Sequence, residues 1–330
     1  MKQQTHAKNP VAVIIPNFNG EAYIENCLNS LKHQTMDAFD IIVVDDASKD
    51  RSLEILKGTD AITLIENAEN SGFARSINNG IRAAQNDFVL LLNNDVVVER
   101  DFVEKLYAAI KDDPKIFSVS SRMVRYYERD KIDDTGDFYN IFGWAYKRGD
   151  GKPVERYNKP TSVFSTCAGA GIYRRDVLNA IGLFDERYFA YLEDVDVSWR
   201  GRIAGYKNRY APTAVCYHIG SATTAEGQKY SAFKVKISAR NNIYNVYKNM
   251  PLAQLIVNFL FLVVGFAMKG ILFEIKGFGQ DYRAGIKEGL KNARSIGKTP
   301  FKFKNIGHYI KLEAMMIGNV FRYLGEKLCR

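Results

Sequence analysis

The feature that most constrains the fold is an alternation, over the first 120 residues, of short apolar runs with stretches of helical spacing. Residues 11–15, 41–44 and 88–92 are apolar throughout, so each predicts a strand buried on both faces. The segments between them, such as 73–84, have the spacing of amphipathic helices. Buried strands joined by such helices predict an α/β fold, with a mostly parallel sheet flanked by helices.

Polar residues follow these predicted strands. Pro16 and Asn17 come after the first strand, Asp45 and Asp46 after the second, and the run 93–95 after the strand at 88–92. Ligands of open α/β sheets bind beyond the carboxyl ends of the strands. A carboxylate at such an end either caps a helix or binds a nucleoside or a hard divalent cation, and both interpretations stay open on position alone.

The segment 70–80 predicts the start of a helix beside the same edge. Gly72 permits close backbone approach, and a helix N-terminus attracts anions. The segment matches neither the G-x-G-x-x-G fingerprint nor the G-x-x-x-x-G-K-[ST] phosphate loop. Dinucleotide binding and P-loop ATPase chemistry therefore have no motif here.

A dense acidic cluster, Glu193, Asp194 and Asp196, stands in an aromatic and apolar stretch. Aromatic surroundings raise the pKa of a carboxylate, which suits a general base. The alternative is a first helical turn enriched in acids because the helix dipole favours them. Arg200 follows Asp196 at i+4, where the two can pair. His218 ends an apolar run, and a lone histidine is more often a core or surface residue than a ligand.

The last 80 residues differ from the rest in charge and hydropathy. Residues 251–330 hold 13 Lys and Arg against 5 Asp and Glu, so they carry +8 of the net +9. The apolar run 255–268 is shorter than the roughly 20 residues of a spanning helix. We favour a re-entrant or in-plane helix on the inner leaflet over a helix buried at an oligomer interface. The basic residues that would face anionic headgroups are Lys276, Arg283, Lys287, Lys291 and Arg294.

Cysteine spacing and the N-terminal sequence bear on the compartment. The four cysteines lie far apart with no C-x-x-C pair, which argues against a zinc module and fits a reducing cytosol. The first ten residues lack the apolar run of a signal peptide. We therefore expect a cytoplasmic protein, peripheral to or partly embedded in the cytoplasmic face of the membrane. The first 250 residues are nearly neutral, which argues against nucleic acid as a partner.

Taken together in chain order, the motifs between residues 11 and 222 resemble those of an inverting family 2 glycosyltransferase with the GT-A nucleotide-sugar fold. The late histidine is similar to one in bacterial rhamnosyl and galactofuranosyl transferases. The resemblance covers roughly residues 11–222 and rests on the segments 13–19, 43–48, 70–80, 91–95, 169–175, 182–186, 193–200 and 218–220.

The resemblance implies a role for each matching residue. Asp46 binds the uracil or thymine and the ribose, and Asp95 with His218 holds Mn²⁺ or Mg²⁺ on the diphosphate. Asp194 removes the acceptor proton, and Glu193 is the second choice for this base. The first acid of the D-x-D metal motif is Asn93 here, which leaves one negative charge fewer beside the metal. The other implied donor-binding residues are Pro16, Asn17, Asn19, Asn70, Gly72, Asn78, Asn94, Gly169 and Ala170.

We expect an N-terminal tail (1–10), a GT-A domain (11–230) and a helical, membrane-associated extension (231–330). The expected function is sugar transfer, with inversion, from a UDP- or dTDP-sugar to a hydroxyl of a glycan or lipid-linked acceptor in cell-surface polysaccharide synthesis. The segment 125–160 is expected to be a long loop or small excursion that reads the sugar. A homo-oligomer is a further expectation. The alternatives are a nucleotidyltransferase and, because of Asn93, a catalytically inactive nucleotide-sugar-binding scaffold.

Overall fold

The computed structural model describes residues 9–220 and 230–328, so the expected N-terminal tail falls almost wholly outside it. The strands are β1 (Val11–Asn17), β2 (Phe39–Asp45), β3 (Thr63–Glu66), β4 (Phe88–Leu92), β5 (Val96–Val98), β6 (Ile116–Arg125), β7 (Ile132–Asp134), β8 (Asp137–Tyr139), β9 (Ala145–Lys147), β10 (Thr161–Val163), β11 (Ala170–Arg174) and β12 (Lys207–His218). The α-helices are α1 (Ile24–Leu31), α2 (Ser52–Lys57), α3 (Phe73–Ala83), α4 (Phe102–Ile110), α5 (Arg175–Ile181), α6 (Glu193–Ile203), α7 (Ala232–Asn249), α8 (Leu252–Ile275), α9 (Gly279–Ile296) and α10 (Ile306–Leu328). Short 3-10 helices are η1 (Val154–Tyr157), η2 (Glu186–Tyr188) and η3 (Phe303–Asn305).

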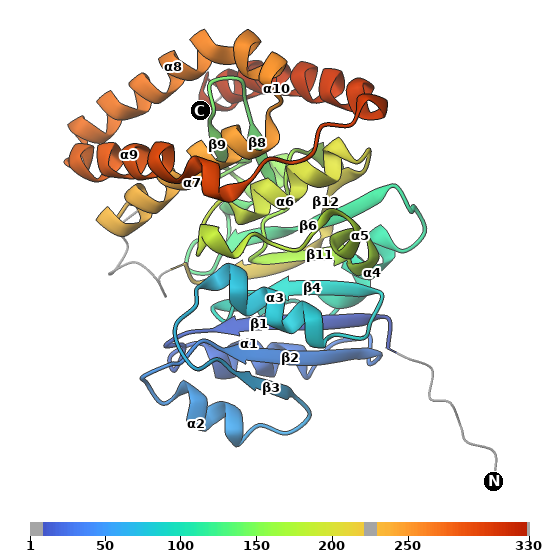
Figure 1. Ribbon diagram of the computed structural model, residues 1–330. Helices are drawn as coiled ribbons and strands as arrows, with labels where there is room; N and C mark the ends of the chain where they lie inside the picture. The colour runs from blue at the N-terminus through green and yellow to red at the C-terminus, as the bar shows by residue number, and fades with distance from the viewer. Residues whose placement is uncertain (1–8, 221–229, 329–330) are drawn as a thin grey trace.

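One ten-stranded sheet forms the centre, in the order β10-β12-β6-β11-β4-β1-β2-β3, with β5 beside β12 and β7 beside β6. Figure 1 shows the part of this order from β12 to β3. β1 pairs in parallel with β2 and β4, and β2 with β3, as the apolar runs predicted. β11 is antiparallel to both β4 and β6, so the sheet as a whole is mixed. Consequently β1, β2, β4 and β12 end, and β11 begins, at one edge of the sheet.

Helices cover both faces of this sheet, which confirms the predicted α/β class. α1 and α4 pack on one face, and α3 and α5 pack on the other. All five residues of β4 are buried between these layers. The polar residues that follow the strands are therefore carried on a rigid, close-packed support.

The middle of the chain is more regular than its composition indicated. Residues 125–160, expected as a loop or small excursion, form β7, η1 and an antiparallel β8–β9 hairpin. The tip of this hairpin packs against α8: the Phe142 and Phe261 ring centroids are 5.8 Å apart, and Trp144 Nε1 donates to the Gly265 carbonyl at 3.0 Å. A Cβ at Gly265 would lie 2.0 Å from the Phe142 carbonyl oxygen, so only glycine permits this contact.

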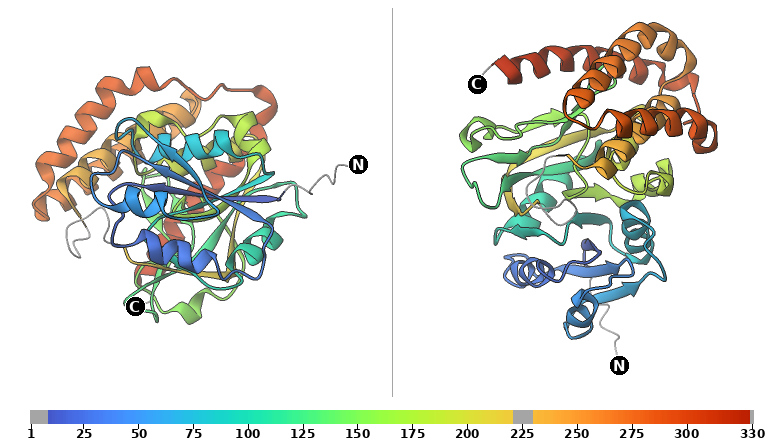
Figure 2. Two further views of the ribbon diagram at one scale, coloured as in Figure 1. Left: turned by 90° about the horizontal axis from the view of Figure 1, so that it is seen from below. Right: turned by 90° about the vertical axis from the view of Figure 1, so that its left-hand side faces the viewer.

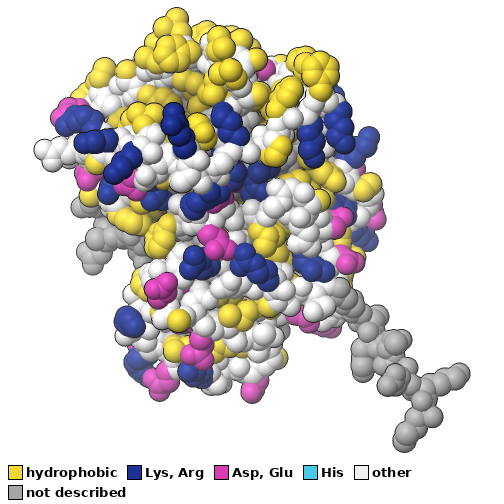
Figure 3. Space-filling view, viewed as in Figure 1, with side chains coloured by type: hydrophobic (Ala, Val, Ile, Leu, Met, Phe, Trp, Pro, Cys, Tyr) yellow, Lys and Arg dark blue, Asp and Glu magenta, His cyan; other side chains and the backbone are white. Residues whose placement is uncertain are grey.

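The C-terminal helices α8, α9 and α10 lie together at one end of the molecule, and α2 and β3 lie at the other (Figures 1 and 2). Along the described chain, α8 is the one helix long and apolar enough to cross a membrane, by length and composition only. Its buried side carries Gln254 and Asn258, which donate to Glu313 Oε2 of α10 at 2.6 and 3.0 Å. Its exposed side is apolar, so α8 has the reverse of the polarity of a helix on a water-soluble surface (Figure 3).

Candidate functional site

The edge where the strands end is held by a network of buried side chains. Asn17 donates to Asp45 Oδ1 at 2.8 Å and to Ser52 Oγ at 3.0 Å, and its own Oδ1 accepts from Asn94 at 2.8 Å. Pro16, which precedes it, is half-buried. These bonds join the carboxyl ends of β1, β2 and β4, so they fix the shape of this edge.

Asp46 lies immediately beyond β2 and holds the loop that leads into α3. Its carboxylate accepts from Asn67 Nδ2 at 2.7 Å, from the Ser71 N–H at 3.0 Å and from the Gly72 N–H at 2.8 Å. Gly72 has φ of +85°, and a side chain there would collide with Phe189. Asp46 therefore fixes this loop, a role that the sequence pattern did not reveal.

Asp95 and His218 meet at the same edge. β5 pairs with β12 so that Val96 faces His218, and the His218 Nε2 to Asp95 Oδ2 distance is 3.4 Å. On its other side, His218 Nδ1 lies 2.9 Å from Asp133 Oδ2. Asp133 is in turn paired with Lys147 Nζ of the β8–β9 hairpin at 3.0 Å.

Hydrogen bonds and opposite charges shift the pKa values of His218 and Asp95. Burial lowers the pKa of His218, but its hydrogen bonds to Asp133 and Asp95 outweigh burial and raise it to about 9. Burial raises the pKa of the Asp95 carboxyl, but the hydrogen bond and charge of His218 prevail and lower it. Without a cation, the Asp95 carboxylate therefore faces a positively charged imidazole.

Asp95 and His218 suit a small divalent cation. The His218 Nε2 and Asp95 Oδ2 atoms lie 3.4 Å apart, so both could meet one small cation. Within the described part of the chain there is no group of three or more His, Cys, Asp or Glu that could hold a metal. A cation here would therefore have Asp95 and His218 as its protein ligands and would take the rest of its shell from phosphate and water. Nearby Asn93 Oδ1 is buried and accepts no hydrogen bond from a described residue.

The three acids at the start of α6 have different environments. Asp194 is partly exposed, and its Oδ2 lies 3.4 Å from the Ala168 N–H beside β11. Glu193 is 4% exposed, and Asp196 is 0% exposed. Asp196 pairs with Arg200 at 2.8 Å, as the i+4 spacing predicted, and with Lys248 at 3.0 Å. Of the three acids, Asp194 is the one open to a ligand.

Burial is the largest cause of the pKa shifts of the first two acids. It raises the pKa of Asp194, and it raises that of Glu193, beside the Asp194 charge, well above the usual range. Asp196 behaves in the opposite way: burial acts to raise its pKa, but the charges of Arg200 and Lys248 outweigh burial and lower it. Asp194 therefore has the environment of a general base, and Asp196 that of a structural anion.

The backbone that leads into α6 is strained. Phe189, Tyr191 and Leu192 all have positive φ, at 65°, 68° and 67°. Asn241 of α7, which is fully buried, donates to the carbonyls of Ala190 and Tyr191 at 2.8 and 2.7 Å. α7 thus holds the segment that presents Asp194. The sequence analysis did not single out Asn241, because a helical pattern does not show that an asparagine side chain bonds the backbone of another segment.

Some residues expected to contact the donor are enclosed in protein instead. Asn17, Asn78 and Ala170 are each 1% exposed. Asn78 donates to the Phe184 carbonyl at 2.8 Å and to Glu186 at 3.0 Å, and accepts from the Phe184 N–H at 3.1 Å. Its amide joins α3 to the segment before α6 and does not face a ligand. In the structure these three side chains are enclosed and shape the edge from within.

The remaining candidates lie along the edge. Asn19 is exposed with φ of 51°, and its Oδ1 accepts from the Lys49 N–H at 2.8 Å. Asn70 is exposed and accepts from the Gly72 N–H at 3.2 Å. The Gly169 carbonyl accepts from the backbone N–H of the residue after β4 at 2.8 Å.

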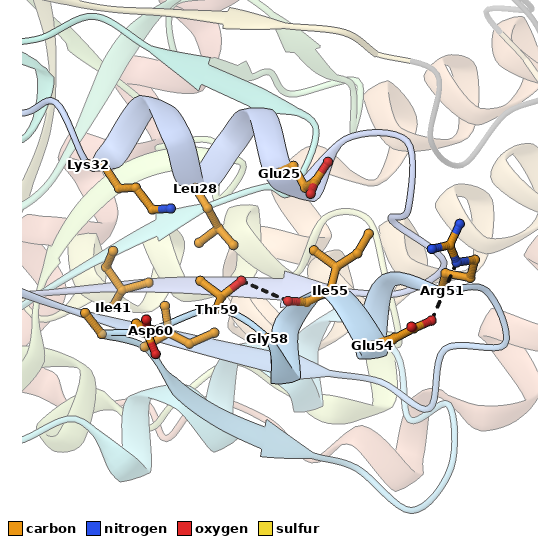
Figure 4. Close-up of a pocket in the computed structure, with 12 residues that line it drawn as sticks. Glu25, Leu28, Lys32, Ile41, Arg51, Glu54, Ile55, Gly58, Thr59 and Asp60 are labelled. Carbon is orange, nitrogen blue, oxygen red and sulfur yellow. Dashed lines mark hydrogen bonds and ion pairs between the residues drawn. The ribbon is translucent and has the colours of Figure 1, made fainter.

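Two cavities lie away from this edge. One, of about 620 Å³, lies between α1, α2 and the segment that leads into β3, and is lined by Leu28, Ile55 and Thr59 among others (Figure 4). The other, of about 550 Å³, lies between α10 and the beginning of β12, whereas His218 is at the end of β12. Neither cavity contains a candidate site residue.

Known proteins resemble this chain in sequence and in fold. Poly-beta-1,6-N-acetyl-D-glucosamine synthase of Staphylococcus aureus (strain COL) is 24% identical over 213 residues, which cover 63% of this chain and 50% of that protein. The chain thus spans about half the length of the curated relatives it matches first. GalNAc-T7, solved with UDP, GalNAc and Mn²⁺, aligns with a TM-score of 0.58 at 16% identity, covering 90% of this chain and 59% of that one.

The mannosyltransferase PcManGT of Pyrobaculum calidifontis, solved with GDP-Man and Mn²⁺, aligns with a TM-score of 0.53 at 16% identity over 87% of this chain and 88% of that one. At this identity, the two solved structures show a shared GT-A fold and nothing finer. The family model of glycosyl transferase family 2 matches residues 12–182, just over half of the sequence. The chain therefore belongs to glycosyl transferase family 2.

Proposed function

We propose that this chain transfers a sugar, with inversion, from a nucleoside diphosphate sugar to a hydroxyl of a glycan or lipid-linked acceptor in cell-surface polysaccharide synthesis. The observation that carries the proposal is the meeting of two groups at one edge of the sheet. Asp95 and His218, 3.4 Å apart, are the residues that would hold a cation, and the partly exposed Asp194 lies beside Ala168, just before β11. A cation would stabilise the leaving diphosphate, and a general base would take the acceptor proton.

Each part of the edge has one task in the proposed mechanism. The loop held by Asp46 and Gly72 binds the nucleoside part of the donor. We infer that the donor is a UDP- or dTDP-sugar. Asp95 and His218 would hold Mn²⁺ or Mg²⁺, which when bound would stabilise the charge on the leaving diphosphate. Asp194 accepts the acceptor proton as the hydroxyl attacks the anomeric carbon. Because a single displacement inverts this carbon, no enzyme nucleophile is needed.

Calorimetric binding of UDP and dTDP, with and without Mn²⁺, tests the donor site. We expect one nucleotide to bind in a Mn²⁺-dependent manner, and Asp95→Ala to lose at least tenfold in affinity because it removes the anionic ligand of the cation. Asp101→Ala, which removes an acid from the exposed start of α4, is the matched control and should bind as the wild type does.

Product analysis separates the alternatives. Sugar transfer releases the nucleoside diphosphate, whereas a nucleotidyltransferase releases pyrophosphate, and an inactive scaffold binds donor without releasing either. A folded chain that binds neither UDP nor dTDP contradicts the choice of base. If the folded chain also fails to bind GDP and CDP, the transferase proposal itself fails.

We further propose that the extension 231–330 binds the cytoplasmic face of the membrane and thereby holds the domain 11–230 there. An apolar surface spreads over α8, and Lys and Arg side chains lie below it (Figure 3). α8 exposes Ile256 and Leu260 by 67% and 69%, and α10 exposes Phe321 by 71%. Contiguous apolar surface of this kind marks a protein or membrane contact. The basic rim matches an anionic bilayer, at about 1 kcal/mol per Lys or Arg near the surface.

Co-sedimentation with phosphatidylglycerol vesicles tests this proposed membrane binding. The double variant Ile256→Glu/Leu260→Glu should bind at least tenfold more weakly, because burying one such side chain contributes about 1.5–3 kcal/mol. Tyr127→Glu, at a side chain 79% exposed in the turn between β6 and β7, is the control and should bind normally. The proposal is contradicted if the double variant binds vesicles as well as the wild type does. It is also contradicted if the chain dimerises through α8 and does not bind vesicles.

A further inference from the structure

His218 has a partner on the side away from Asp95. Its Nδ1 lies 2.9 Å from Asp133 Oδ2, and its Nε2 lies 3.4 Å from Asp95 Oδ2. The ring is therefore held between two carboxylates, with the closer contact on Nδ1. Asp133 belongs to none of the motifs on which the family resemblance rests, because it stands on β7 in the segment 125–160.

The strand pairing makes this contact part of the sheet. β6 is bordered by β12 on one side and by β7 on the other, with His218 opposite Arg125 and Ile132 opposite Val124. Asp133, next to Ile132, is thus placed across the end of β6 from His218. Its side chain is 17% exposed, as is that of His218, so water competes little for this bond.

Lys147 sets the state of Asp133. Its Nζ lies 3.0 Å from the same Asp133 Oδ2 that meets His218. Because the Lys147 ammonium can only donate, this oxygen of Asp133 is an acceptor toward both of its neighbours. An acceptor at Nδ1 requires a proton on that nitrogen, and in a neutral imidazole this leaves the lone pair on Nε2.

We propose that Asp133 is a positioning residue: it holds the proton of His218 on Nδ1, so that Nε2 is presented beside Asp95 to the donor-bound cation. The inference rests on the proposed function, since it assumes a cation at Asp95 and His218. Histidine ligands of metals in proteins almost always donate their second N–H to a carboxylate, carbonyl or water, which fixes the tautomer and the ring orientation. Asp133, braced by Lys147, supplies that acceptor here.

The first measurement is Mn²⁺ affinity, by electron paramagnetic resonance in the presence of the bound nucleoside diphosphate. We expect Asp133→Ala to bind Mn²⁺ roughly 10–100-fold more weakly than the wild type, the range for loss of such a partner. Asp133→Asn keeps an acceptor of the same shape and should lose less. Asp130→Ala, at an exposed acid in the same turn, is the matched control and should bind normally.

The second measurement reports the tautomer directly and does not depend on activity. In protein labelled with ¹⁵N at its four histidines, with Mg²⁺ and nucleotide bound, His218 should carry its proton on Nδ1. Asp133→Ala should abolish this fixed state. Asp133→Leu, which is similar in size but offers no acceptor, serves if the alanine variant does not fold.

The outcomes separate the two proposals. If the wild type and Asp95→Ala bind Mn²⁺ equally poorly, the cation proposal fails and Asp133 has no cation to serve. If Asp95→Ala abolishes binding while Asp133→Ala stays within twofold of the wild type, the cation proposal stands and the role of Asp133 is overturned. A proton on Nε2 in the wild type with Mg²⁺ and nucleotide bound also overturns it.

Discussion

Asp194→Asn should lower turnover by about 10²- to 10⁴-fold, the usual contribution of a positioned general base, and should leave donor affinity unchanged. The amide is nearly isosteric, and its oxygen can still accept from the Val195 N–H, which lies 2.8 Å from the carboxylate. The variant therefore keeps the fold of the helix start and loses only the ability to take a proton. Release of nucleoside diphosphate in the presence of acceptor measures turnover, and calorimetry measures donor affinity.

Glu193→Gln is the matched control for this experiment. It neutralises the adjacent acid, which is buried and has an oxygen without a hydrogen bond from any described residue. We expect a smaller loss of turnover, because Glu193 is enclosed and cannot reach an acceptor hydroxyl. Near-normal turnover in Asp194→Asn contradicts the assignment of Asp194, and the reverse order of effects identifies Glu193 as the base.

Asp196→Ala should reduce the free energy of unfolding by about 3–5 kcal/mol, as is typical when one partner of a buried ion pair is removed. Asp196 is fully buried and pairs with Arg200, 7% exposed, and with Lys248. Without Asp196, the guanidinium of Arg200 retains only neutral partners, such as the Leu183 carbonyl at 2.7 Å. Equilibrium denaturation in urea measures the loss.

An exposed ion pair provides the comparison for Asp196. Arg51 and Glu54 of α2 lie 3.5 Å apart with most of both side chains in water. Glu54→Ala should therefore cost less than about 1 kcal/mol. If both variants unfold at the same urea concentration as the wild type, the pairing of Asp196 with α7 contributes nothing to stability, and its structural role is refuted.

Much of the fold could be predicted from the sequence, for a simple physical reason. A strand buried on both faces must be apolar throughout, so residues 88–92 were predicted as a strand with the bounds that the structure has. Strand direction then placed Asp46 and Asp95 at one edge. The meeting of Asp95 with His218 followed from the family resemblance, since the periodicity of the sequence does not encode the pairing of β5 with β12.

The parts that could not be predicted depend on contacts between distant segments. β6 escaped prediction because serines interrupt its apolar pattern, yet Ser118, Ser120 and Ser121 are buried. Ser121 Oγ donates to the Ala170 carbonyl at 2.7 Å, and Ser118 bonds Asn208 at 3.0 Å. Polar groups at these positions are tolerated only because the fold supplies their partners. Asp133 was missed for the same reason, since its partners lie on other strands.

The β8–β9 hairpin has a consequence for acceptor choice. Its tip is fixed to α8 through Trp144 and Gly265, and its base carries Lys147 beside the cation site. With α8 seated on lipid, this short span of backbone sets the height of the reaction above the bilayer. A lipid-linked acceptor would then be glycosylated only at a hydroxyl that lies at this height above the bilayer.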